Sequence, residues 1–130
     1  MERPGTNARG DGAFIVLGHA IPRPTFIDIA YTLHHTAGVH LEWDEEKNLG
    51  NFRKHGVWFE EAQTIWADDL AVEFYDSEYE EGEQRYLRVG TSTRHRLLLV
   101  VSCERHGEVI RIISARRATS NERRDYEKGI

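Results

Sequence analysis

The sequence has little of what several common classes of small protein depend on. Its 130 residues include one cysteine, Cys103, so a disulfide scaffold is excluded. Its apolar runs all fall well short of the roughly 20 residues that span a bilayer. The best candidate, residues 13–33, is interrupted by two prolines and two charged residues, which is not typical of a signal peptide. We therefore expect a soluble protein in a reducing, cytoplasmic compartment.

Several catalytic motifs are also missing from the sequence. It has no phosphate-binding glycine loop, nucleophile elbow, HExxH motif or paired cysteines, so nucleotide hydrolysis, serine-hydrolase and metalloprotease activities have no support. No cysteine or carboxylate stands at a ligand spacing beside the four histidines of the first 40 residues, which are His19, His34, His35 and His40. We expect no metal and no other cofactor.

Charge is distributed unevenly along the chain. The net charge is -5, but residues 41–83 carry 14 acidic and 3 basic side chains, whereas residues 84–130 carry 11 basic and 5 acidic ones. Ten of those 11 basic residues are arginines. Because arginine binds phosphate and carboxylate with two parallel hydrogen bonds, this distribution indicates an anion-binding surface in the C-terminal third. The alternative is that the two segments neutralise each other within one fold.

The first 38 residues differ in character from the rest. They are rich in glycine, proline, threonine and histidine and have little sustained periodicity. We predict that residues 1–38 form a flexible or poorly structured extension and that residues 39–130 form the folded domain.

Two helices are predicted at the start of this domain. Asp44 is the expected N-cap of a helix that runs to His55, with Leu49 and Phe52 on one face. Gly56 favours the left-handed conformation that ends a helix, and positive charge is favourable in the last turn. A second helix is expected over residues 58–67, with a buried stripe formed by Phe59, Ala62, Ile65 and Trp66.

Strand patterns account for most of the remaining sequence. A short strand is predicted before the first helix, four more at residues 71–75, 85–90, 97–102 and 109–115, an acidic turn at residues 76–83 and a tight hairpin at residues 106–107. In the last strand, alternation places Arg111 and Ile113 on one face and Ile112 and Ser114 on the other. A capping box at residues 119–122 begins a final helix. The order, β-α-α-β-β-β-β-α, predicts an α+β domain around a mainly antiparallel sheet.

The remaining candidates for chemistry are cations and one imidazole. Lys54 and His55 lie at a helix end, Arg85 begins a strand, and Arg116 and Arg117 follow the last strand. Cleavage of RNA without a metal needs a base for the ribose 2′-OH, an acid for the leaving 5′-oxygen and cations for the phosphorane charge. These residues suit that chemistry if they meet at one phosphate-sized spot beside the imidazole.

Each of these residues also has a structural interpretation. Lys54 and His55 can stabilise the C-terminal end of the helix dipole, and Arg85 can form a surface ion pair with an acidic residue such as Glu83. Arg116 and Arg117 point to opposite sides if the strand continues through them, so we expect at most one of them at a given site.

Three motifs together resemble the BrnT toxins of bacterial type II toxin-antitoxin systems. They are LEWDEEKNLGNFRKHGVWFEEA at residues 41–62, ERHGEVIRIISARRAT at residues 104–119 and ERRDYEKG at residues 122–129. The resemblance implies a RelE-like fold and a metal-independent RNA endonuclease that arrests translation. It also implies neutralisation by BrnA, a ribbon-helix-helix antitoxin, with operator DNA bound only through the antitoxin complex and no membrane association.

The resemblance also implies residue roles. It assigns proton transfer to His55, with Lys54 beside it, and phosphate and transition-state charge to Arg85 and Arg116. We add Arg117 and Arg111 as substrate-binding candidates. The alternative hypothesis is a non-catalytic regulatory module that binds an antitoxin and modulates its DNA binding. A protein that binds DNA alone has less support, because the sequence shows no recognition helix.

Overall fold

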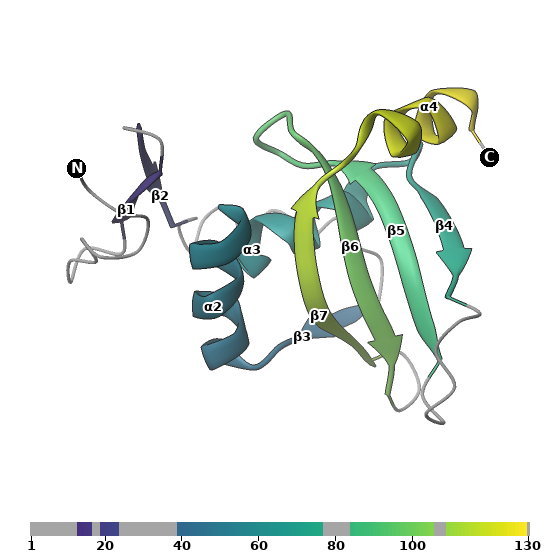
Figure 1. Ribbon diagram of the computed structural model, residues 1–130. Coiled ribbons are helices and arrows are strands. Elements are labelled where there is room, and N and C mark those ends of the chain that lie inside the picture. The colour runs from purple at the N-terminus through teal and green to yellow at the C-terminus, as the bar shows by residue number, and fades with distance from the viewer. Residues whose placement is uncertain (1–12, 17–18, 24–38, 77–83, 106–108, 130) are drawn as a thin grey trace.

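A five-stranded sheet in the order β3-β7-β6-β5-β4 is the centre of the fold in a computed structural model of the chain (Figure 1). The structure describes residues 13–16, 19–23, 39–76, 84–105 and 109–129. The elements in these ranges are β1 (Ala13–Val16), β2 (His19–Pro22), β3 (His40–Glu42), α2 (Glu45–His55), α3 (Phe59–Ala62), η1 (Gln63–Ala67), β4 (Val72–Tyr75), β5 (Arg85–Thr91), β6 (Leu97–Glu104), β7 (Val109–Arg117) and α4 (Ser120–Lys128).

The predicted α+β architecture is confirmed. Strands β4, β5, β6 and β7 pair antiparallel, and β3 runs parallel to the first part of β7. Ahead of the predicted order, β1 and β2 pair antiparallel with each other. The hairpin turn expected at residues 106–107 and most of the acidic turn lie outside the described residues, and the division of the chain at residue 38 stays a prediction.

The caps of α2 are those that the sequence predicts. The Asp44 side chain accepts a hydrogen bond from the backbone N–H of Glu46, and Gly56 ends the helix in the left-handed conformation with φ of 73°. The second predicted helix is divided, because the four residues of α3 continue as the 3₁₀ helix η1. Three members of its predicted stripe are fully buried, and Trp66 is half-buried.

The two faces of the sheet are covered differently. On the face that we call the α3 face, Leu98, Val100, Ile112 and Ala115 pack with α3 and η1 in the main core cluster. On the opposite face, the α4 face, Val72, Val89, Leu97 and Leu99 pack against Tyr126 of α4. α4 lies across one end of its face, and Figure 1 shows the strands continuing beyond it.

A β-bulge in β7 corrects one sequence prediction. Val101 of β6 pairs with Ser114, but the next residue, Ser102, pairs with Ile112, so Ile113 is an extra residue in β7. The prediction that Ile112 and Ser114 share a face is therefore wrong, because their partners are consecutive residues of β6 that point to opposite faces.

The last helix has the predicted start. The Thr119 side chain accepts from the Glu122 N–H, and the Glu122 carboxylate accepts from the Thr119 N–H, which completes the capping box. The hydroxyl of Tyr126 donates to Asp68 at 2.8 Å and accepts from Thr91 at 3.1 Å, and these bonds fix α4 against the sheet end. None of the helices in the described ranges is long and apolar enough to cross a membrane.

Candidate functional site

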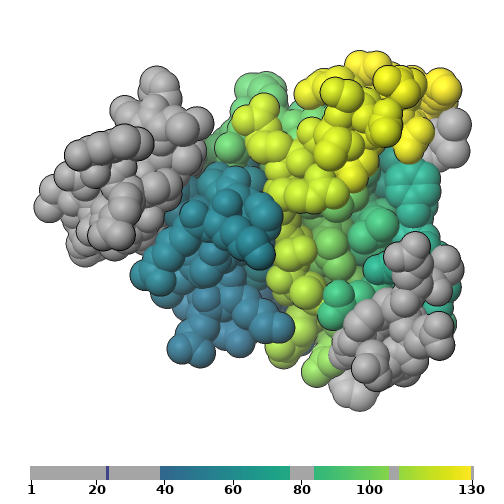
Figure 2. Space-filling model, in the orientation of Figure 1, coloured from purple at the N-terminus to yellow at the C-terminus, as the bar shows by residue number. Residues whose placement is uncertain are grey.

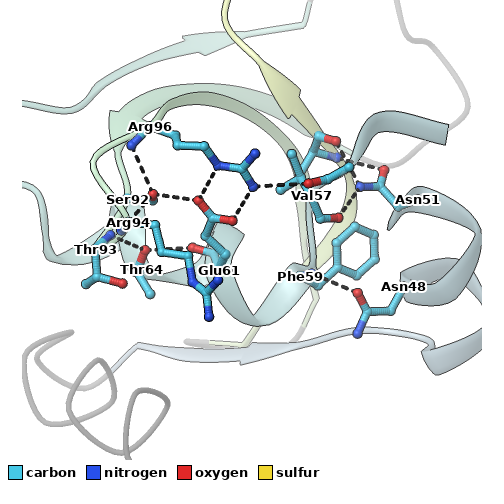
Figure 3. Close-up of polar contacts among 12 residues, drawn as sticks. Asn48, Asn51, Val57, Phe59, Glu61, Thr64, Ser92, Thr93, Arg94 and Arg96 are labelled. Atoms are coloured by element: carbon cyan, nitrogen blue, oxygen red, sulfur yellow. Dashed lines mark hydrogen bonds and ion pairs between the residues drawn. The ribbon is translucent and has the colours of Figure 1, made fainter. Parts of the chain in front are cut away.

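The C-terminal half of α2 is attached to the free edge of β7 by one buried side chain. The Asn51 amide donates to the backbone oxygens of Ala115 at 2.8 Å and Val57 at 2.9 Å, and its oxygen accepts from the Ala115 N–H at 3.1 Å (Figure 3). Asn51 thus satisfies β7 backbone groups beyond the three residues that β3 pairs. This contact brings His55 close to the end of β7.

A buried ion pair fixes the chain immediately after α2. Glu61 is 1% exposed and pairs with the Arg96 guanidinium, which also donates to the backbone oxygen of Gly56 at 3.1 Å (Figure 3). Ser92 donates to the same carboxylate at 2.7 Å. The position of His55, one residue before Gly56, is therefore determined by contacts to α3, to the β5–β6 turn and to β7.

His55 lies in a positively charged environment. Partial burial, together with the charges of Lys54 and Arg116, lowers the pKa of His55 below its ordinary value of 6.5. The imidazole is therefore mainly neutral at pH 7 and can accept a proton. Lys54 itself is exposed at the last turn of α2.

Arg116 is held by a carboxylate of α4. Its guanidinium makes two hydrogen bonds to Glu122, at 2.9 and 2.8 Å, and a third to the backbone oxygen of Arg117. The same contact lowers the pKa of Glu122 and raises that of Arg116. Because a guanidinium carries five N–H donors, this arrangement leaves two for another anion.

Arg85 of β5 and Arg111 of β7 flank β6 at the other end of the sheet. Both pair in register with Cys103, the buried residue between them on β6, so their side chains point to the same face. Arg85 is half-buried, and Arg111 donates to Glu42 of β3 at 3.0 Å.

The register places the three arginines on the α4 face. Arg116 pairs with Leu99, which is four residues from Cys103 on β6 and therefore shares its face. Four strand residues correspond to about 13 Å, so the cations occupy two places on this face and not the single spot expected. Arg117, exposed, pairs with Leu98 and points to the opposite face, as predicted for neighbours in a strand.

The α4 face is open between these two places. Figure 2 shows β7 and the strands beside it exposed between α2 and α4. Two pockets lie elsewhere, one beside Asp68 and Ser92 and one beside Glu73 and Tyr86, and neither is lined by a predicted site residue. In the described part of the chain, no three histidines, cysteines or carboxylates are grouped to bind a metal. The site is therefore an extended cationic surface.

Sequence reasoning missed the residues that build this site. It placed Leu49 and Phe52 on the inner face of α2, but the residues buried there include two asparagines, Asn48 and Asn51. Their spacing relative to Phe52 and His55 follows the helix period, and that signal could have identified them. Nothing local in the sequence marks Glu122 as the partner of Arg116 beyond its place in the capping box.

Comparisons with known proteins identify the family of the chain. A family model described as the ribonuclease toxin BrnT of type II toxin-antitoxin systems matches residues 43–122. The match covers more than half of the chain, which therefore belongs to the BrnT family, and the resemblance seen in the sequence is confirmed. The Brucella abortus ribonuclease toxin BrnT, solved at 1.1 Å resolution, is a similar structure with 23% identity and a TM-score of 0.49. The similarity covers 63% of this chain and 99% of that one. No curated protein gives a significant match.

Proposed function

We propose that this protein is the toxin of a type II toxin-antitoxin system, acting as a cytoplasmic, metal-independent RNA endonuclease that inhibits translation. The observation that carries the proposal is the arrangement of three arginines on the open α4 face with a mainly neutral imidazole beside one of them. Such a surface supplies both a proton acceptor and positive charge for a phosphodiester.

The proposed reaction uses groups from α2 and β7. The His55 imidazole takes the proton of the ribose 2′-OH, whose oxygen attacks the adjacent phosphorus, and the bond to the 5′-oxygen breaks. The ammonium of Lys54 is the candidate donor of a proton to that leaving oxygen. The N–H groups of Arg116 that Glu122 does not use stabilise the charge on the phosphorane.

Arg85 and Arg111 are proposed to bind the RNA backbone away from the cleaved bond. Along the sheet they lie about 13 Å from the position of Arg116. An extended RNA strand covers that distance in a few nucleotides. Arg117 is a weaker candidate for the same strand because its side chain points to the α3 face.

The proposed partner is a BrnA-like ribbon-helix-helix antitoxin, through which the complex binds operator DNA. Carboxylates already pair with Arg111 and Arg116 within the chain, so an acidic segment of a partner has suitable groups to bind on the α4 face. This mode of neutralisation would compete directly with RNA.

Purified protein incubated with RNA in excess EDTA tests the activity. Wild type is expected to cleave, His55→Ala and Arg116→Ala to lose most activity with unchanged circular dichroism, and Lys47→Ala, which removes an exposed charge earlier in α2, to cleave normally. Cleavage that requires added metal, or full activity in both site variants, would contradict the proposal.

One observation favours a second function. Because Arg111 and Arg116 are both paired with carboxylates, the surface also fits a non-catalytic module that binds an antitoxin and modulates its DNA binding. Expression of the chain alone separates the two functions, since the endonuclease stops growth and degrades RNA, whereas the module changes only the affinity of the antitoxin for its operator.

A further inference from the structure

A buried carboxylate of α3 is paired with an arginine from outside the family match. The side chain of Glu60 is 8% exposed, and its Oε1 accepts from the amide of Asn48 at 2.8 Å. Its Oε2 accepts from Nε of Arg23 at 2.8 Å. A carboxylate with so little exposure is strongly destabilised unless a cation or several donors pair with it.

The surroundings of the Arg23 side chain suit a guanidinium specifically. The guanidinium carbon lies 4.8 Å from the ring centroid of Trp58, and a second carboxylate, Glu45, pairs with it at 2.7 Å. Trp58 is 1% exposed and stacks on Phe52 with ring centroids 4.2 Å apart, so its ring is a fixed surface. Arginine supplies a planar group that can stack on a ring and donate hydrogen bonds along two edges. Lysine has no such planar group.

We propose that Glu45, Glu60 and Trp58 form a guanidinium-binding slot, and that Arg23 of this chain's own N-terminal segment is its occupant and attaches that segment to α2 and α3. The three slot residues lie within residues 43–122, which match the family model. Arg23, which fills the slot, lies outside that range. The attachment is thus a feature of this chain in addition to its family membership.

The slot is separate from the proposed RNA site. Glu45 is in the first turn of α2 and His55 is its last residue, ten residues away, which corresponds to about 15 Å along the helix. Figure 1 shows β1 and β2 on the side of α2 away from the sheet. Occupation of the slot therefore affects the attachment and stability of the chain, and failure of the slot proposal leaves the endonuclease proposal intact.

A double-mutant cycle on the full chain tests the pairing. Thermal melting is measured for wild type, Arg23→Ala, Glu60→Gln and the double variant, with Arg123→Ala as the matched loss of an exposed arginine of α4. We expect Arg23→Ala to lower the melting temperature by several degrees, Arg123→Ala to leave it unchanged, and the double variant to lose less than the sum of the single losses. Equal melting temperatures for the two arginine variants, or strictly additive losses, would overturn the proposal.

Chemical rescue tests the specificity for a guanidinium. Millimolar methylguanidinium is expected to raise the melting temperature of Arg23→Ala but not that of wild type, and methylammonium is expected to have no such effect. Arg23→Lys should remain close to Arg23→Ala in stability. Rescue by both cations alike, or by neither, would refute a guanidinium slot even if Arg23 contributes to stability.

Discussion

His55 is the residue whose environment makes the most direct prediction. Because burial and two positive neighbours lower its pKa, we expect an NMR titration of its ring protons to give a midpoint below 6.5. Replacing Lys54 with methionine removes one of the charges and should raise that midpoint. A wild-type midpoint at or above 6.5, or one that Lys54→Met leaves unchanged, would contradict the assigned environment.

The same shift predicts how activity and stability depend on pH. If His55 is the base, RNA cleavage should increase with pH through this lowered pKa and then level off. In the unfolded chain His55 has its ordinary pKa, so between the two pKa values the unfolded state binds more protons than the folded state. The contribution of His55 to the free energy of unfolding therefore decreases as pH falls below about 6.5.

Glu122 is expected to limit the access of phosphate to Arg116. Glu122→Gln removes the competing charge but keeps a side chain that can complete the capping box, so affinity for a non-cleavable RNA should increase. Because the pair is partly exposed, the loss in the free energy of unfolding should be about 0–1 kcal/mol. RNA binding and urea unfolding measure the two effects. Glu127→Gln makes the same charge change at an exposed position of α4, and an equal gain in RNA affinity there would show that the Arg116 pair is not responsible.

The junction between helix α2 and strand β7 depends on Asn51. Asn51→Ala removes three hydrogen bonds to backbone groups of Ala115 and Val57 that remain buried, so we expect a loss of about 2 kcal/mol or more in the free energy of unfolding. Asn121→Ala, an exposed asparagine of α4, should change it by less than about 0.5 kcal/mol. Urea denaturation measures both variants. Similar losses in the two would mean that the Asn51 bonds contribute little.

The helices show what local sequence determines. The limits of α2 and the start of α4 follow from Asp44, Gly56 and Thr119, because caps act on the backbone within one turn of the residue concerned. The bulge at Ile113 has no comparable local signal, since it depends on the register of β7 against β6. Without it, Arg111 and Arg116, five residues apart, are expected on opposite faces.

The sequence predicts which residue types form the candidate site, but it does not predict where these residues lie in the folded molecule. The excess of arginine in residues 84–130 indicated an anion-binding surface, and the resemblance identified the family. That the arginines divide between two places, and that Glu42 and Glu122 pair with two of them, depends on contacts between distant segments. Composition and spacing contain no information on such contacts.

The arrangement predicts the salt dependence of RNA binding. If Arg85, Arg111 and Arg116 each neutralise one phosphate of a single strand, the logarithm of the binding constant should fall with the logarithm of salt concentration with a slope of about -2. Arg85→Ala should reduce the slope by about 0.7, whereas Lys47→Ala should leave it unchanged. Titrations of a non-cleavable RNA at several salt concentrations measure these slopes. The same slope for Arg85→Ala and wild type would remove Arg85 from the RNA surface.

The extra residue of β7 has a genetic consequence. Removing Ile113 would make Ile112 and Ser114 consecutive residues opposite Ser102 and Val101, which are also consecutive, so the arginines of both halves of the strand would keep the face to which they point. A selection for survivors of toxin expression should therefore recover substitutions of arginine and histidine codons but not the one-codon deletion of Ile113.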